Sequence, residues 1–155
     1  MKRIMLAAIA ISCLSTMSFA QGTSAPQKEN PKRRVAKTGA PPNGLLSPAI
    51  ISGDLVFTSG QIGIDSKTGQ IVEGGLEAQL EQVFKNLTAV LEASGSSIDH
   101  ILKTTVFLAD MNDYNTMNEL YRKHFKSDPP ARSTIQVARL PRDAKIEIEA
   151  IAVLK

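Results

Sequence analysis

Cysteine and large aromatic side chains are scarce in this chain. It has one cysteine, Cys13, no tryptophan, two tyrosines and five phenylalanines among 155 residues. A single cysteine cannot form an internal disulfide, so cysteine-stabilised small folds are excluded. So few aromatic rings also argue against binding of single-stranded nucleic acid, which depends on stacked aromatic side chains.

Metal ligands are equally scarce. The two histidines, His100 and His124, lie far apart in the sequence and show no ligand spacing. Each is interpreted as a surface or cap residue. We therefore expect no metal site.

The first twenty residues have the pattern of a secretory signal peptide. A basic start, Lys2-Arg3, precedes an apolar run over 4–14, and Ser-Phe-Ala at 18–20 supplies small residues at a cleavage site. The apolar run is too short to predict a membrane span. We expect a periplasmic or secreted protein that starts near Gln21, lacks cysteine and thiolate chemistry, and has no stable membrane insertion. An uncleaved anchor, or lipidation at Cys13, is the alternative.

Positive charge is concentrated ahead of the expected folded part. Residues 28–37 hold five Lys and Arg against one Glu, whereas residues 38–155 hold eleven against fourteen Asp and Glu, a net charge of −3. Segment 21–44 is rich in Pro, Gly, Ser, Lys and Asn without apolar periodicity, which predicts a disordered basic tail. A contact of this tail with phosphates or anionic lipid is the alternative to a solvated linker.

Apolar periodicity starts at residue 45 and predicts one domain over 45–155. Strand patterns cover 49–51, 55–58, 101–108, 131–137 and 146–154, and two helical stripes lie between them, giving the order β-β-α-β-α-β-β. This order predicts an α+β fold, a single sheet with both helices on one face. The first stripe is Leu76, Leu80, Val83, Phe84, Leu87, Val90 and Leu91, and the second is Tyr114, Met117, Leu120, Tyr121 and Phe125.

Polar residues interrupt the strand patterns in three places. Gly60 follows a strand, where a missing side chain lets a ligand approach the backbone. Arg132 opens a strand and can bind a carboxylate with two parallel hydrogen bonds. Glu147 shares a strand face with Ile151 and Val153, which indicates a partly buried face, as at a subunit boundary, where a carboxylate can act as general acid or base. Taken singly, these residues also fit a turn, a surface ion pair and an exposed glutamate.

Five motifs in order resemble the RidA/YjgF family of reactive-intermediate deaminases. They are VFTSGQI at 56–62, KTTVFL at 103–108, PARS at 130–133, VARLP at 137–141 and IEIEAIAV at 146–153, and the resemblance runs from about residue 44 to 155. It implies a chorismate-mutase-like fold with one mixed sheet and a homotrimer with pockets between subunits. It also implies hydrolysis of small imine or enamine carboxylates to 2-keto acids and ammonia, without metal or organic cofactor.

The resemblance also assigns roles to single residues. Glu147 matches the glutamate that activates water, and Arg132 matches the arginine that binds the substrate carboxylate. Leu46 stands near the position of a tyrosine that lies against the substrate in active members, so an apolar wall remains while a hydroxyl and a ring are lost. We expect this change to affect rate and substrate range. The implied pocket lining is Ser59, Gly60, Thr134, Asn118 and Leu46, besides Arg132.

Two other functions compete with the deaminase. The same trimer could bind small carboxylates, or act as a chaperone, without turnover, as the change at Leu46 and the predicted export favour. A ribonuclease activity is ascribed to some relatives, but the net charge of −3 over residues 38–155 and the lack of a catalytic histidine pair argue against a nucleic-acid partner.

The signal-peptide hypothesis predicts the first residue of the exported chain. Expressed in a Gram-negative-type host, the protein should fractionate with the periplasm and start at or near Gln21, since signal peptidase cleaves after small residues. N-terminal sequencing of the periplasmic fraction measures this. A full-length cytoplasmic protein that starts at Met1 would contradict the hypothesis.

Overall fold

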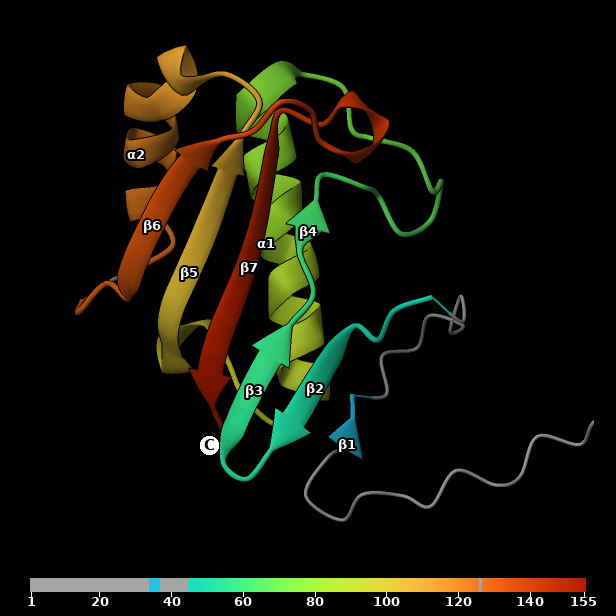
Figure 1. Cartoon of the computed structure of the whole chain (residues 1–155), viewed down its shortest axis with the longest axis vertical. Helices are drawn as coiled ribbons and strands as arrows, with labels where there is room; N and C mark the ends of the chain where they lie inside the picture. The colour runs from blue at the N-terminus through green and yellow to red at the C-terminus, as the bar shows by residue number, and fades with distance from the viewer. Residues whose placement is uncertain (1–33, 37–44, 126) are drawn as a thin grey trace, which may run out of the picture.

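One mixed seven-stranded sheet, covered on one face by two helices, makes up the computed structural model (Figure 1). The structure describes residues 34–36, 45–125 and 127–155, so the predicted signal peptide and most of the predicted tail lie outside the described residues. The arrangement confirms the predicted α+β class. The strands are β1 (Arg34–Val35), β2 (Ala49–Ser52), β3 (Leu55–Thr58), β4 (Gln61–Ile62), β5 (Ile101–Leu108), β6 (Ala131–Gln136) and β7 (Ile146–Val153), and the helices are α1 (Gly75–Ala93) and α2 (Tyr114–Arg122).

The last strand of the chain lies inside the sheet. The strand order is β1-β2-β3-β7-β5-β6, and β4 also pairs with β7. On one side of β7, β3 pairs with its carboxyl half and β4 with its amino half, both antiparallel. On the other side β5 runs antiparallel to β7, and β6 runs parallel to β5 after the crossover through α2.

The helical stripes meet the sheet as predicted. All seven apolar residues of the α1 stripe are buried, and in α2 Met117, Leu120 and Tyr121 are buried. Tyr114, at the start of α2, is 38% exposed, and Phe125 lies beyond the last residue of the helix and is only partly buried. Within the described residues, no helix combines the length and apolar character needed to cross a bilayer.

A break between β3 and β4 interrupts the ladder along β7. The β3 pairing ends at Phe57, opposite Ile151, and the β4 pairing starts at Gln61, opposite Ile148. The amide of Ala150 lies in this gap and donates a 2.9 Å hydrogen bond to the hydroxyl of Thr58, which is buried. A side chain thus replaces a strand partner for a buried N–H, because an unpaired amide in the interior is costly.

Two strands were not predicted, because two residues are too few to show an alternating pattern. β4 is held to α1 by Asn86, whose side-chain amide donates to the carbonyls of Ile62 and Ile64 at 3.0 and 2.9 Å. β1 lies in segment 21–44, where we expected disorder, and pairs antiparallel with β2. Ala36, next to β1, is buried and donates to the carbonyl of Ala49 at 3.1 Å. Residues 34–36 are therefore ordered against the sheet edge.

Thr58→Val should lower the free energy of unfolding by about 1–3 kcal/mol, because the substitution keeps the shape but leaves the buried amide of Ala150 without an acceptor. Thr88→Val is the matched control. The Thr88 hydroxyl donates to the carbonyl of Phe84 within α1, so its loss should cost no more than about 0.5 kcal/mol. Denaturant unfolding at one protein concentration measures both values, and equal losses would contradict the role given to Thr58.

Candidate functional site

Glu147 and Gly60 form one half of the candidate site. Glu147 lies on the sheet face that points away from the helices, since its neighbours Ile146 and Ile148 are fully buried in the core. A methyl group at position 60 would lie 1.8 Å from Oε1 of Glu147. Only glycine therefore lets the backbone after β3 pass this close to the carboxylate.

Ser59 ties this half to the segment before β2. Its amide donates to the carbonyl of Pro48 at 2.9 Å, and its hydroxyl donates to the carbonyl of Ser47 at 2.7 Å. Leu46, the residue before Ser47, is 58% exposed. The predicted residues Leu46, Ser59, Gly60 and Glu147 thus come from connected stretches around the break between β3 and β4.

The pKa of the Glu147 carboxyl is raised above its usual range. Burial is the main cause, and the negative charge of Glu149 adds to it. Both disfavour the ionised form. A carboxyl group with a raised pKa exchanges protons more readily near neutral pH, which suits a general acid or base.

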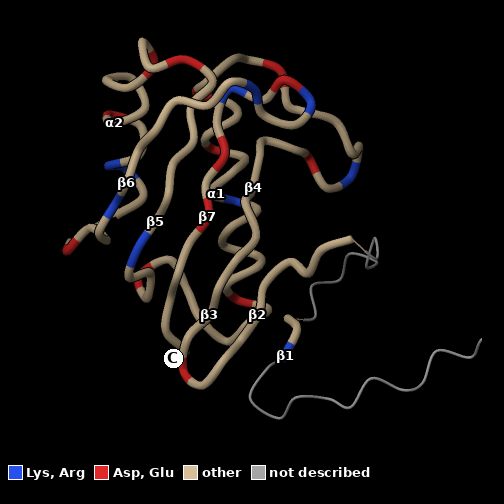
Figure 2. Tube along the Cα trace, in the orientation of Figure 1, with Lys and Arg blue, Asp and Glu red and all other residues tan. Residues whose placement is uncertain are grey.

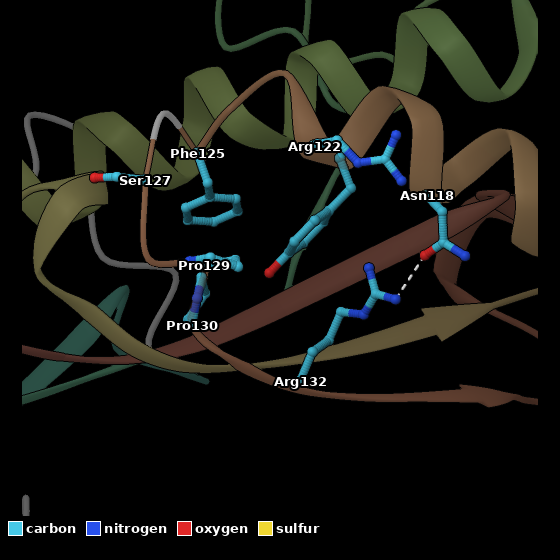
Figure 3. A pocket seen from close by; sticks show the side chains of 8 residues that line it. Asn118, Arg122, Phe125, Ser127, Pro129, Pro130 and Arg132 are labelled. Atoms are coloured by element: carbon cyan, nitrogen blue, oxygen red, sulfur yellow. Dashed lines mark hydrogen bonds between the residues drawn. The ribbon is translucent and has the colours of Figure 1, made fainter.

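Arg132 and Asn118 form the second half, on the helix side of β6. Nη2 of Arg132 donates a 2.5 Å hydrogen bond to Oδ1 of Asn118, drawn as a dashed line in Figure 3. Nη1 lies 3.8 Å from the sulfur of Met117. The Cζ atom lies 4.7 Å from the ring centre of Tyr121 and 5.9 Å from that of Tyr114. Since these four residues are spaced i, i+3, i+4 and i+7, one stripe of α2 holds the guanidinium.

The strand register explains why Arg132 faces the helices. In the parallel pairing of β5 with β6, Arg132 lies beside Thr104, which is fully buried beneath the helices. Thr134, two residues farther along β6, lies on the same face. Its hydroxyl is buried and has no hydrogen-bond partner among the described residues. Buried hydroxyls in folded proteins usually have a hydrogen-bond partner, so the Thr134 hydroxyl is an exception.

A pocket of about 680 Å³ opens next to this second half (Figure 3). Apolar rings make up much of its wall, and guanidinium groups supply positive charge. Such a mixture suits a small organic anion. Its lining is Asn118, Tyr121, Arg122, Phe125, Ser127, Pro129, Pro130 and Arg132.

The histidines belong to neither half. Nδ1 of His100 lies 2.8 Å from the Ser97 hydroxyl, and the His124 ring stacks on Phe84 with 3.7 Å between ring centres. Among residues 34–36, 45–125 and 127–155, no three His, Cys, Asp or Glu side chains gather as possible metal ligands.

Within one chain the two halves do not meet. Arg132 of β6 points to the helix side, whereas Glu147 of β7 points to the opposite side of the same sheet. Figure 2 shows the basic position of β6 and the acidic positions of β7 on different strands, with β5 between them. The structure thus groups Arg132 with Asn118 and Thr134, and Glu147 with Gly60 and Ser59.

Sequence analysis missed three residues that contact Arg132. Tyr114, Met117 and Tyr121 were interpreted only as a packing stripe of α2. The available signal was Asn118, a polar residue inside that stripe and one turn from Tyr114 and Tyr121. A polar side chain in an apolar stripe indicates a buried polar partner.

Comparisons with known proteins agree on one family. Residues 37–154 match the family model described as Endoribonuclease L-PSP. The human 2-iminobutanoate/2-iminopropanoate deaminase is 46% identical over 123 residues, which span 78% of this chain and 90% of the human protein. E. coli TdcF, solved with bound serine, has a TM-score of 0.73 at 41% identity and covers 79% of this chain and 99% of its own.

The E. coli YjgF gene product is a second solved structure of this kind. It has a TM-score of 0.71 at 42% identity, covering 78% of this chain and 98% of its own. These neighbours confirm the predicted chorismate-mutase-like, YjgF-type fold.

The raised pKa of Glu147 predicts a pH-dependent effect of Glu147→Gln on stability. A carboxyl whose pKa is raised by folding destabilises the folded state once the pH exceeds its pKa in the unfolded chain, which is near 4.5 for glutamate. Glu147→Gln removes this penalty. Its melting temperature should therefore exceed that of the unmodified protein at pH 7, and the difference should shrink as the pH falls toward 4.

Thermal melts at several pH values measure this difference. Glu77→Gln, which removes an exposed carboxylate from the first turn of α1, controls for the change in net charge. A difference that stays constant with pH, or that is equal in both variants, would contradict the prediction.

Proposed function

Because the chain belongs to the Endoribonuclease L-PSP family, which is the RidA/YjgF family, we infer that it is a RidA-like deaminase that hydrolyses small imine and enamine carboxylates to 2-keto acids and ammonia. The main support for this function is that contacts with α2 fix the guanidinium of Arg132 at the edge of a pocket. A fixed guanidinium binds a planar carboxylate with two parallel hydrogen bonds.

Arg132 anchors the substrate. A guanidinium has five N–H donors, and contacts with Asn118 and Met117 engage both terminal nitrogens only in part. The remaining donors bind the carboxylate of the imine. The carboxylate next to the C=N carbon then fixes where that carbon lies, so that water attacks from one direction.

Glu147 moves the protons. Its carboxylate takes a proton from water as the oxygen bonds to the imine carbon, the pair of electrons of the C=N bond shifts to nitrogen, and Glu147 passes that proton to the nitrogen to give the carbinolamine. The carbinolamine then collapses: Glu147 takes the proton of the new hydroxyl and gives it to the amine nitrogen, the C–N bond breaks with its electron pair leaving on ammonia, and the C=O bond of the 2-keto acid forms. A raised pKa makes both transfers accessible near neutral pH.

The active assembly we propose is a homotrimer whose pockets take Arg132 from one subunit and Glu147 from its neighbour. The opposite orientation of the two side chains in one sheet supports this assembly, because one small substrate cannot touch both within a single chain. Exposed apolar side chains on the face that carries Glu147 support it too: Leu55, Phe57 and Ile135 are 36%, 40% and 46% exposed. Large apolar side chains left on one sheet face favour burial against another subunit.

Two variants test the roles. With freshly generated 2-iminopropanoate, Glu147→Gln should lower the rate of pyruvate release by roughly 10²–10⁴-fold, because it removes the proton acceptor, and should leave 2-ketobutanoate binding unchanged. Arg132→Ala should abolish that binding in calorimetry. No pyruvate release by the unmodified protein above the spontaneous rate would exclude the deaminase and favour a binding trimer without turnover.

Mixing the same two variants tests the shared pocket. If each pocket takes Arg132 and Glu147 from different subunits, every mixed trimer contains one intact pocket, and random mixing should restore about a quarter of the unmodified activity. Trimers of either variant alone serve as controls. Activity that stays at the level of the separate variants would show that both residues of a pocket come from one chain.

A further inference from the structure

Tyr121 occupies an unusual place in the core. It is 5% exposed, and its ring packs edge-on against Phe84 and tilted against Phe125, with ring centres 5.6 and 4.9 Å away. Its hydroxyl is nevertheless buried and lies 2.7 Å from the hydroxyl of Thr104. Burial raises the pKa of Tyr121, which therefore remains a neutral phenol.

The hydroxyl of Tyr121 contacts β5, and its ring contacts Arg132 of the neighbouring strand β6. Thr104 of β5 is the direct neighbour of Arg132 in β6. The Tyr121 hydroxyl binds Thr104, while the Cζ atom of Arg132 lies 4.7 Å from the centre of the Tyr121 ring. The ring is thus fixed to the same strand pair whose arginine it contacts.

A phenylalanine would pack against the aromatic neighbours equally well. The phenol hydroxyl adds a bond that stops the ring from tilting out of its plane, and a fixed ring face attracts a guanidinium placed over it. An arginine on a sheet edge otherwise samples several rotamers, and each wrong one removes its donors from the substrate.

We propose that Tyr121 is a positioning residue for Arg132, its ring holding the guanidinium in the orientation that binds a carboxylate, and that Thr104 locks this ring in place. The inference rests on the proposed function, since it concerns how the same anion site binds its substrate. The ring of Tyr121 lines the same pocket beside Arg132. It acts through Arg132.

The test removes the ring and measures binding and turnover separately. Tyr121→Leu and Tyr121→Met should raise the KM for 2-iminopropanoate about tenfold, and the Kd for 2-ketobutanoate alike, with kcat within about twofold. A higher KM with an unchanged kcat is expected, because Arg132 binds the carboxylate equally well in the substrate and in the transition state. Tyr121→Met is included in case the Tyr121→Leu variant does not fold, because the flexible methionine side chain can fill the vacated volume. Tyr121→Phe, which keeps the ring but loses the bond to Thr104, should recover only part of the lost affinity, and full recovery would contradict the role given to Thr104.

Leu87→Ala is the control for a general loss of core packing. Leu87 is fully buried in α1, whereas the side-chain contacts of Arg132 described above come from α2. The variant should lower the melting temperature with KM unchanged when assays run well below that temperature. A parallel rise of KM in Leu87→Ala would show that loosened packing alone accounts for the effect and would overturn the proposal.

A double-mutant cycle tests whether Tyr121 acts through Arg132. In an Arg132→Lys background the ring no longer has a guanidinium to orient, so Tyr121→Met should change KM and Kd by less than about twofold. The same tenfold rise in both backgrounds, or no rise in the Tyr121 variants alone, would overturn the positioning role. Failure of the proposed function gives a different result. If the unmodified protein binds 2-ketobutanoate without turnover, the Kd values still test the role of Tyr121. If the unmodified protein neither binds 2-ketobutanoate nor releases pyruvate, both inferences are overturned.

Discussion

β7 receives hydrogen bonds from three other strands, and the alternation of its side chains sets the two faces of the sheet. Its buried side chains, such as Ile146 and Ile148, complete the core beneath α1. The next residue on the other side is Glu147. Because a strand cannot turn one side chain without turning its neighbours, the packing of the core dictates the direction of the Glu147 carboxyl. The packing of the core and the direction of this candidate site residue thus depend on the same strand.

The break between β3 and β4 shows how the sheet makes room for chemistry. In the β4 ladder Glu147 lies opposite Ile62. In the break before β4, Gly60 leaves the space beside the Glu147 carboxylate free of a side chain, and the Thr58 hydroxyl accepts the hydrogen bond of the Ala150 amide. The buried amide of Ala150 in the break thus has a side-chain acceptor, and burial raises the pKa of Glu147 beside it.

Sequence patterns predicted the elements better than the contacts between them. The α1 stripe and the alternation of β7 were evident, because seven apolar residues at helical period and four at every second position of β7 leave little choice. Strand β6 offered no such pattern, so the face of Arg132 depended on its register with β5, which only the structure gives. Tyr121 shows a second limit: apolar periodicity explains its burial but not its hydroxyl, whose partner Thr104 lies 17 residues away.

The contact between Gly60 and Glu147 also restricts how this sequence can change. Every other amino acid places a Cβ atom where the Glu147 carboxylate now lies. A side chain at position 60 therefore requires the Glu147 carboxylate, the far end of a flexible side chain, to move away from its present place. A shorter acid at 147 would leave space for a methyl group at 60, and that exchange draws the carboxyl back toward the sheet. The two positions form a linked pair, because a substitution at 60 changes where the carboxyl of residue 147 lies.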